Sequence, residues 1–292
     1  MQTWGGVAGK RVLITGATRG IGLAAAVELA RRGAQLTLIA RSEVRAAEAV
    51  RQIQAAALGA GVDVLSADLA SQASVRQLAS AALAKYSSIQ VLINNAGAIY
   101  ARRQLSPDGI ELTWAVNHLA PFLLTTLLLD RLKSSTPARI VTTSSDAHRS
   151  ASIPFDDLNA ERAWGGFGFT RYGETKLANI LFTAELAQRL AGTHVTANSF
   201  HPGFVATGFN RNNGFLIRVG MALTRPFARS ATTGAKTLVW LVDSEAGGET
   251  SGGYFVDERL VTPSAAAQDR DAARRLWQVS EAQVQAAPRW PA

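Results

Sequence analysis

The 292-residue sequence contains no cysteine and has only four histidines and two methionines. Without cysteine the chain can form no disulfide, no thiolate metal site and no cysteine nucleophile. The histidines are His118, His148, His194 and His201, and they lack the i,i+4 pair and the HExxH spacing that are typical of zinc enzymes. We therefore expect no metal site.

Negative charge is also in short supply. The chain has 22 Asp and Glu against 30 Lys and Arg, a formal net charge of +8, which raises the question of a nucleic-acid partner. The cations are nearly all arginine, and their longest runs are pairs such as Arg31-Arg32 and Arg102-Arg103. Because a nucleic-acid reader concentrates basic residues on one face, this scatter predicts a solvated surface and no nucleic-acid partner.

Long hydrophobic runs are missing as well. The most apolar stretch, Leu119–Leu129, is about half the length that spans a bilayer, and it ends at Asp130-Arg131. No signal peptide is recognisable before Lys10. We therefore expect a cytoplasmic protein with no membrane span.

The sequence does contain an alternation of short β-branched runs with longer Ala/Leu-rich helical periods. Strands that are apolar throughout and separated by helices indicate a parallel sheet covered on both faces. We predict an α/β fold, a single doubly wound Rossmann domain over residues 1–292 with about seven strands. The predicted strands are Arg11–Thr15, Gln35–Ala40, Val62–Ser66, Gln90–Asn94, Arg139–Thr143, His194–Phe200 and Gly253–Val256. The predicted helices are Ile21–Arg32, Ser42–Leu58, Ser71–Tyr86, Gly109–Lys133, Arg171–Ala191 and Ser230–Asp243.

A glycine-rich turn joins the first predicted strand to the first predicted helix. Glycines in such a turn let a pyrophosphate approach the backbone and the helix N-terminus. We therefore predict a dinucleotide phosphate loop. Its members are Gly16, Thr18, Arg19, Gly20, Ile21 and Gly22.

The end of the second predicted strand bears on the choice of dinucleotide. An acidic residue there would bind a ribose 2′-OH and repel a 2′-phosphate, but this sequence has Arg41, with Arg19 in the phosphate loop. Arginine forks match phosphate geometry, so we predict NADP(H) in preference to NAD(H). Asp68 and Leu69 follow the third strand, where the carboxylate is expected to accept from the adenine amine.

Tyr172 and Lys176 are four residues apart, which places them on one face of the predicted helix. A tyrosine hydroxyl titrates near pH ~10, and a nearby ammonium stabilises the phenolate and lowers that pKa. Tyr172 is therefore a candidate general acid and base. Ser145, at the end of the fifth predicted strand, is placed to hydrogen-bond a substrate oxygen as negative charge develops there.

Together these residues resemble the short-chain dehydrogenase/reductase family over nearly the whole chain. The matching pieces also include Asn94-Asn95-Ala96-Gly97, Asn117 and the segment 202–207. The resemblance implies a catalytic tetrad of Asn117, Ser145, Tyr172 and Lys176, in which Lys176 also binds the nicotinamide ribose. It further implies cofactor contacts by Asn94 at the adenosine ribose, by Ala96 and Gly97, and by Pro202, Gly203, Val205 and Thr207 at the nicotinamide. Ser144 is expected to be structural.

Segments such as Val116–Leu119, Ser145–His148 and Lys176–Phe182 resemble the retinol dehydrogenase and protochlorophyllide reductase-like group. The absence of cysteine disfavours the light-driven pigment reductases, which use cysteine near the pigment. The resemblance further implies a homodimer paired through the apolar surfaces of helices 109–133 and 171–191. His148 and His201 are expected to orient loops.

Two irregular segments, at about 147–170 and 208–229, are rich in glycine and aromatics, and we predict that they are substrate loops. Their aromatic and aliphatic residues are expected to wall an apolar pocket. The expected wall comprises Phe155, Trp164, Phe167, Phe169, Phe204, Phe209, Phe215, Leu216 and Met221.

We therefore predict an NADP(H)-dependent oxidoreductase that acts on a lipophilic ketone, aldehyde or secondary alcohol, with Tyr172 as general acid and base. A C=C (enoyl-type) reductase of the same family is the first alternative. A non-catalytic NADP(H)-binding regulator and a sugar-nucleotide epimerase are further alternatives.

Overall fold

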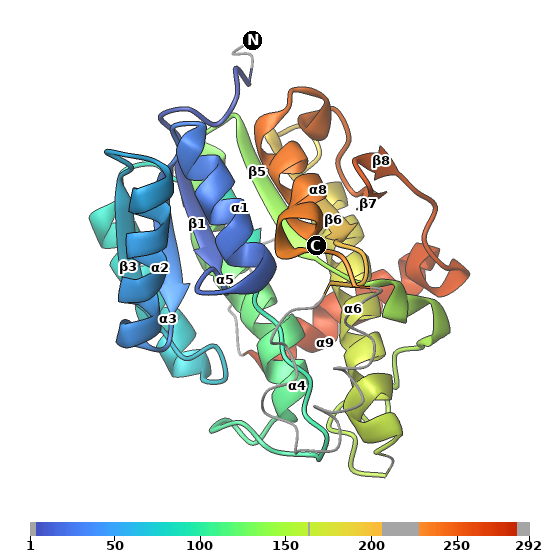
Figure 1. The fold of residues 1–292 in the computed structure, drawn as a ribbon. Coiled ribbons are helices and arrows are strands. Elements are labelled where there is room, and N and C mark those ends of the chain that lie inside the picture. The colour runs from blue at the N-terminus through green and yellow to red at the C-terminus, as the bar shows by residue number, and fades with distance from the viewer. Residues whose placement is uncertain (1–3, 163, 206–227, 285–292) are drawn as a thin grey trace.

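The structure, a computed structural model, describes residues 4–162, 164–205 and 228–284. Eight strands form one sheet in the order β3-β2-β1-β4-β5-β6-β7-β8, and all are parallel except β8 (Figure 1). The chain runs outward from β1 to β3 and then returns to β4 on the other side of β1, which makes the β1/β4 junction the switch point of a doubly wound sheet. The strands are β1 (Arg11–Thr15), β2 (Gln35–Ala40), β3 (Val62–Ser66), β4 (Val91–Asn94), β5 (Ala138–Thr143), β6 (Val195–His201), β7 (Tyr254–Val256) and β8 (Arg259–Leu260).

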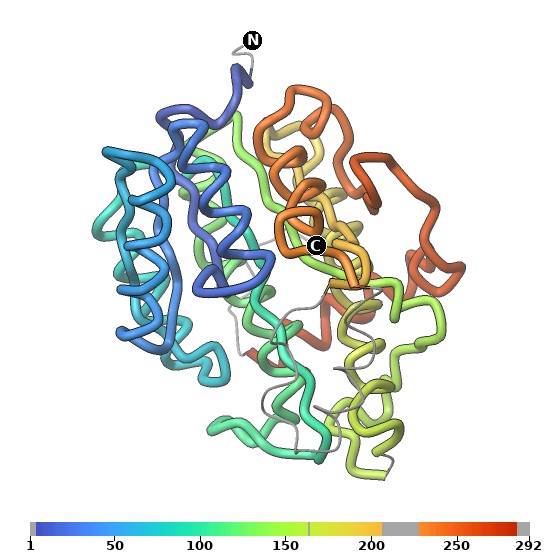
Figure 2. Tube along the Cα trace, in the orientation of Figure 1, coloured from blue at the N-terminus to red at the C-terminus, as the bar shows by residue number. Residues whose placement is uncertain are grey.

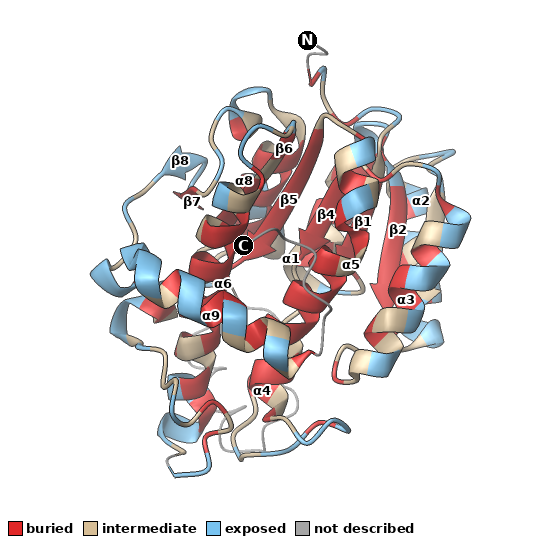
Figure 3. Ribbon diagram, turned by 180° about the vertical axis from the view of Figure 1, so that it is seen from behind, coloured by how far each residue is buried: buried red, intermediate tan, exposed pale blue. Residues whose placement is uncertain are grey.

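Helices cover both faces of this sheet, as Figures 1 and 3 show from opposite sides. One face carries α1 (Gly20–Arg31), α2 (Glu43–Ala56) and α8 (Ala231–Asp243). The other carries α3 (Gln72–Lys85), α5 (Ala120–Ser134), α6 (Phe169–Arg189) and, outside α6, α9 (Arg270–Gln283). Shorter elements are α4 (Leu112–Trp114), η1 (Ala115–Leu119), η2 (Asp146–Ser150), η3 (Gly166–Gly168), η6 (Ala246–Gly248) and η7 (Ala265–Gln268).

The central strands are buried on both sides because they are apolar on both sides. Every residue of β4 and β5 is buried, and one hydrophobic cluster lies on each face of the sheet. This confirms the predicted α/β class and the parallel sheet covered by helices. The sheet has one strand more than predicted, since the two-residue β8 is antiparallel and too short for a periodicity signal.

The helix predicted from Gly109 starts later. Glu111 caps it, because its carboxylate accepts from the backbone N–H groups of Thr113 and Trp114 at 2.8 and 2.9 Å. After the single turn of α4 the backbone widens into the π-helical turn η1 before it continues as α5. Such π turns are frequent at functional sites, and this one carries Asn117.

Helix α9 was not among the predicted helices, and it changes the expectation of a dimer. Leu276 and Trp277 of α9 are buried, and the Trp277 ring centroid lies 4.9 Å from that of Phe122 in α5 and 5.9 Å from that of Phe182 in α6. In the trace of Figure 2, α9 lies beside α6. Part of the apolar surface expected to pair with a second chain is therefore covered by the chain's own α9, which argues against the expected homodimer.

One helical segment of the described chain, Leu112–Ser134, is long and apolar enough to cross a membrane. Of its most apolar window, 83% is buried inside the protein. It packs between the sheet, α3 and α6, and this is the position of a core helix.

Candidate active site

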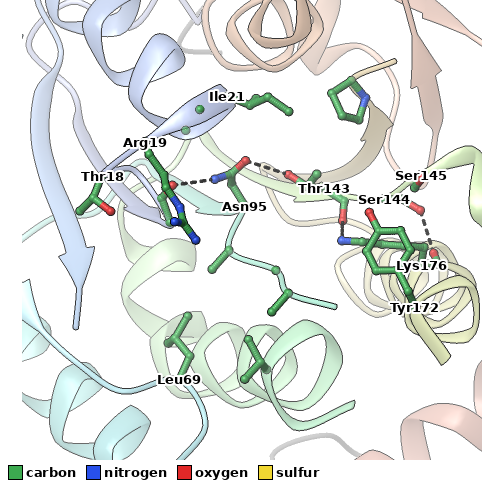
Figure 4. Close-up of a pocket in the computed structure, with 18 of the residues that line it drawn as sticks. Thr18, Arg19, Ile21, Leu69, Asn95, Thr143, Ser144, Ser145, Tyr172 and Lys176 are labelled. Atoms are coloured by element: carbon green, nitrogen blue, oxygen red, sulfur yellow. Dashed lines mark hydrogen bonds between the residues drawn. The ribbon is translucent and has the colours of Figure 1, made fainter. Parts of the chain in front are cut away.

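A cavity of about 940 Å³ opens at the carboxyl ends of β1, β2, β4, β5 and β6 (Figure 4). This is where a doubly wound sheet binds its ligand, at the switch point. The predicted site residues that line it are Gly16, Thr18, Arg19, Gly20, Ile21, Gly22, Arg41, Asp68, Leu69, Ala96, Gly97, Ser145, Tyr172, Lys176, Pro202, Gly203 and Val205.

The glycine loop is shaped by close approach of the backbone. Gly16 has a φ of +69°, a region that disfavours side chains. A Cβ on Gly22 would lie 2.4 Å from the Gly16 carbonyl oxygen and 2.5 Å from Asn95 Nδ2, which no other residue could tolerate. The loop leads into α1, whose N-terminus has no side-chain cap. Its first N–H groups therefore suit an anion from the cavity.

Asn95 holds this loop, whereas Asn94 does not reach it. Asn95 Nδ2 donates to the carbonyls of Thr15 and Gly16 at 3.0 and 3.2 Å, and Thr143 donates to its Oδ1 at 3.4 Å (Figure 4). The buried Asn94 side chain donates to Thr125 Oγ1 at 3.0 Å and does not line the cavity. The expected contact of the Asn94 side chain with a ribose is therefore corrected, because alternation along β4 turns it into the core.

Arginine side chains line the β2 end of the cavity. Arg41 is 71% exposed and lies 3.8 Å from the Asp68 carboxylate, and Arg19 enters from the glycine loop. Arg45, in the first turn of α2, also lines the cavity and was missed in the sequence. Its signal was its place four residues after Arg41, in the first turn of the helix that follows β2.

Ser145, Tyr172 and Lys176 meet at the β5 end of the cavity (Figure 4). Ser145 follows β5 and hydrogen-bonds to Tyr172, while Lys176 Nζ donates to the Thr143 carbonyl at 3.0 Å. Nζ lies 5.3 Å from the centroid of the Tyr172 ring, so the spacing of four places the two side chains together as predicted.

Burial dominates the electrostatics of this end. It raises the pKa of Tyr172 to about 12, against a smaller opposite effect of the Ser145 hydrogen bond. It also lowers the pKa of Lys176 to about 8. The expected lowering of the Tyr172 pKa by Lys176 is therefore not found, because Nζ is directed at the Thr143 carbonyl and burial disfavours the phenolate.

Asn117 lies beneath the cavity. Its Oδ1 accepts from the Ala98 N–H at 2.7 Å, and its Nδ2 donates to the Ala98 carbonyl at 2.8 Å and to Thr175 at 3.1 Å. It therefore clamps the segment after β4 to α6. Ser144 donates to the Lys176 carbonyl at 2.7 Å and so ties β5 to α6, as a structural residue would.

Some of the residues that were expected to wall the substrate pocket line the cavity. Of the expected aromatics, Phe169 and Phe204 line the cavity, Phe155 packs under Arg275, and Phe167 is 71% exposed. Thr207, Phe209, Phe215, Leu216 and Met221 lie outside the described residues. The remaining apolar wall was missed because it comes from residues 105–116, a segment that carries no aromatic cluster. It consists of Leu105, Pro107, Leu112 and Val116.

A parallel doubly wound sheet with a glycine-rich turn at its switch point defines a Rossmann-type protein. The comparisons with known proteins narrow this class. A family model described as short chain dehydrogenase matches residues 10–157. Retinol dehydrogenase 12 of Mus musculus is 42% identical over 275 residues, which cover 94% of this chain and 86% of the relative. A candidate daunorubicin C-13 ketoreductase of Streptomyces is 40% identical, with 96% and 94% covered.

Solved structures agree with this. An uncharacterised protein from Mycobacterium paratuberculosis is 31% identical, with a TM-score of 0.78 and all of both chains covered. RhlG of Pseudomonas aeruginosa, solved with NADP, is 25% identical with a TM-score of 0.69, and 91% of this chain and 100% of that chain are covered. The chain belongs to the short-chain dehydrogenase/reductase family, in its retinol dehydrogenase-like group, and it is an oxidoreductase.

Proposed function

We propose that this protein interconverts a lipophilic ketone or aldehyde with its alcohol, using NADP(H). The observation that carries the proposal is the meeting of Tyr172, Ser145 and Lys176 at one end of a cavity with arginines at its other end. An acid–base hydroxyl beside a hydrogen-bond donor is what reduction of a carbonyl needs.

The residues present fit a phosphorylated dinucleotide. The uncapped start of α1 and the side-chain-free surface of Gly16 and Gly22 suit a pyrophosphate, and Arg41 and Arg45 suit a ribose phosphate. NADP is present in the solved complex of RhlG and in that of a Burkholderia cenocepacia short chain dehydrogenase, which is 27% identical. When bound, the nicotinamide would supply or accept the hydride.

The chain's own residues then handle the proton and the oxygen. Tyr172, whose pKa is raised to about 12, is protonated at neutral pH and would donate its proton to a carbonyl oxygen as that oxygen gains charge. Ser145 would donate a second hydrogen bond to the same oxygen. Lys176, which is mostly protonated at pH 7, would hold the ribose by donating to its hydroxyl groups.

A lipophilic substrate is supported by the walls of the cavity near Tyr172. Leu112, Val116, Phe169 and Phe204 give that region an apolar lining, and apolar pockets favour apolar ligands. Among the relatives, the retinol dehydrogenases are named for a lipophilic alcohol, and the candidate ketoreductase is named for the ketone daunorubicin.

The proposal is tested with a panel of lipophilic and hydrophilic carbonyls and alcohols, assayed with NADPH and NADH in parallel. We expect lipophilic carbonyls to be reduced and NADPH to be preferred. Tyr172→Phe should lose at least about 100-fold in kcat, the lower limit of the usual range for a general acid. Tyr86→Phe is the matched control, since Tyr86 bonds to Asp63 away from the cavity.

Product analysis with an α,β-unsaturated carbonyl distinguishes the two reactions open to this family. The allylic alcohol is expected, and the saturated carbonyl would identify a C=C reductase instead. Turnover confined to hydrophilic carbonyls, or full activity of Tyr172→Phe, would contradict the proposal.

A further inference from the structure

Asp146 and His201 have no role in the proposed reaction, but they connect the two loops that carry Ser145 and the turn at Pro202-Gly203. Asp146 directly follows Ser145 and begins η2, and His201 ends β6 directly before Pro202. His201 Nδ1 accepts from the Asp146 backbone N–H at 3.4 Å, and His201 Nε2 lies 3.3 Å from Asp146 Oδ2. Both ring nitrogens of one histidine therefore contact the same residue, and both residues line the cavity.

The Asp146 carboxylate is itself held from a third strand. Tyr254 of β7 donates its hydroxyl proton to Asp146 Oδ1 at 3.1 Å, and Arg149 of η2 lies 3.3 Å from the same oxygen. The contacts from His201 and Tyr254 come from neighbouring strands, whereas Arg149 belongs to the turn that Asp146 starts. Only the first two can therefore fix Asp146 relative to the sheet.

A second histidine holds Ser145 from the other side. His148 Nδ1 lies 2.7 Å from the Ser145 carbonyl oxygen, and His148 Nε2 accepts from the Ser264 N–H at 3.1 Å. The His148 ring also packs edge-on against Tyr254, with 5.0 Å between centroids. The peptide after Ser145 is therefore held between two imidazole rings.

These contacts specify the protonation of each ring. His201 must carry its proton on Nε2, because Nδ1 faces an N–H group, and His148 must carry its proton on Nδ1 for the same reason. Burial lowers the pKa of both histidines, so the neutral forms prevail at pH 7. The charged groups that act on His201 are Asp146, Arg229 and Asp257, and the last two pair with each other.

We propose that Asp146 and His201 form a positioning pair that fixes Ser145 relative to the turn at Pro202-Gly203. This inference rests on the proposed function, in which Ser145 holds the substrate oxygen and that turn lines the nicotinamide site. Hydride transfer needs the reacting atoms about 3–3.5 Å apart, and a displacement of 1 Å can cost roughly 100-fold in rate. Asp146 is adjacent to Ser145 and His201 is adjacent to Pro202, so the pair connects the serine to this turn directly.

The kinetic test uses Asp146→Asn, His201→Phe and His201→Gln, with Arg149→Gln as control. The first two should lower kcat by about 10- to 100-fold and raise the isotope effect with C4-deuterated NADPH. Their Kd for NADPH should change less than about threefold, since the phosphates bind at the other end. His201→Gln keeps a donor toward the carboxylate and should recover part of kcat. Arg149→Gln removes a contact to the same carboxylate without unlinking the loops and should keep wild-type kcat.

A merely structural role predicts a different pattern. It would lower the active fraction and the melting temperature, and it would leave the isotope effect unchanged. An unchanged isotope effect, a kcat within twofold of wild type in Asp146→Asn, or equal losses in Arg149→Gln would each overturn the pair.

A second test does not depend on turnover. With only four histidines in the chain, ¹⁵N NMR at pH 7 can be assigned by single substitutions, and it should show the Nε2–H form of His201 and the Nδ1–H form of His148. A different tautomer of His201 would overturn the pair even in an active enzyme. Added NADP⁺ should shift the amide resonances of Ser145 and Asp146 in the wild type and in Arg149→Gln, and less in Asp146→Asn.

The histidine and amide resonances distinguish a failure of the proposed function from a failure of the Asp146–His201 pair. If the wild type reduces no carbonyl in the panel but shows the expected tautomers and shifts, the proposed function fails and the pair stands. Equal shifts in all three proteins, or no shift in any, would overturn the pair.

Discussion

At the residue scale, the excess of positive charge has a local use at only a few positions. Arg19, Arg41 and Arg45 line the end of the cavity at β2, whereas arginines such as Arg51 form surface pairs and Arg139 holds backbone carbonyls. A guanidinium fork suits a phosphate ester better than a hydroxyl, which is the reason for expecting NADP(H).

The first prediction concerns these arginines. The double variant Arg41→Ala/Arg45→Ala should raise the KM for NADPH by about 10- to 100-fold, which corresponds to the loss of one charge-assisted contact of roughly 1.5–3 kcal/mol. The KM for NADH should change less than about threefold. Arg51→Ala is the control, because Arg51 also lies on α2 but pairs with Glu48 outside the cavity. A wild type that prefers NADH would refute the role assigned to Arg41 and Arg45.

The second prediction concerns the proton of Tyr172. Burial raises its pKa from 10.0 to about 12, so the folded protein holds this proton more tightly than the unfolded chain does. The near-ultraviolet absorbance difference between wild type and Tyr172→Phe should therefore show almost no tyrosinate at pH 10, where an ordinary tyrosine is half ionised. The free energy of unfolding should fall as the pH rises from 10 toward 12, because the stability that Tyr172 contributes through its bound proton is lost there. Half ionisation at pH 10 would disprove the burial effect.

At the element scale, a buried charge network sets the start of α6, where Tyr172 lies. Arg171 Nε pairs with Glu111 at 2.8 Å and its Nη1 with Glu174 at 2.8 Å, and it also donates to the Leu158 carbonyl. Glu111 meanwhile caps α4. One guanidinium therefore joins α4, α6 and the loop at 147–170, which are the three elements around the catalytic end.

The third prediction follows from this burial. Arg171→Leu would leave the Glu111 carboxylate buried without its cation and should lower the free energy of unfolding by about 3–5 kcal/mol. Arg51→Leu, which breaks an exposed pair on α2, should cost no more than about 1 kcal/mol. Chemical denaturation of both variants measures the difference, and equal costs would contradict the network.

At the scale of the whole molecule, α9 closes the face of α5 and α6 by contacts with four elements. His118 of η1 bonds Ser280 at 2.8 Å, and Trp114 of α4 donates to Gln283 at 2.9 Å. Trp277 packs on Phe122 and Phe182. An apolar surface covered within the chain has no reason to pair with a second copy.

The fourth prediction is therefore the mass in solution. Light scattering after gel filtration should give 31.0 kDa for the wild type. Deleting residues 270–292 should uncover apolar surface and shift the protein to dimers or larger species, while Arg274→Ala, on the exposed side of α9, should keep the wild-type mass. A wild-type dimer would show that another surface pairs.

Much of this architecture could be predicted because its signals are local. The strands β1, β2 and β3 have the bounds expected from their apolar runs, and Tyr172 and Lys176 share a face because a helix repeats every 3.6 residues. Asn95 and the wall at Leu105 and Leu112 could not be found in this way. Each acquires its place from the packing of segments distant in sequence, which periodicity does not encode.

The sequence by itself determined the fold class, the glycine loop, the residue types at the catalytic end and the excess of arginine. These depend on backbone geometry and on polarity within one segment. Only the tertiary structure decided that Asn95 and not Asn94 supports the loop, that burial rather than Lys176 sets the pKa of Tyr172, and that α9 covers the expected dimer face. Burial and coverage depend on which distant segments pack together, and therefore on the sum of contacts across the whole chain.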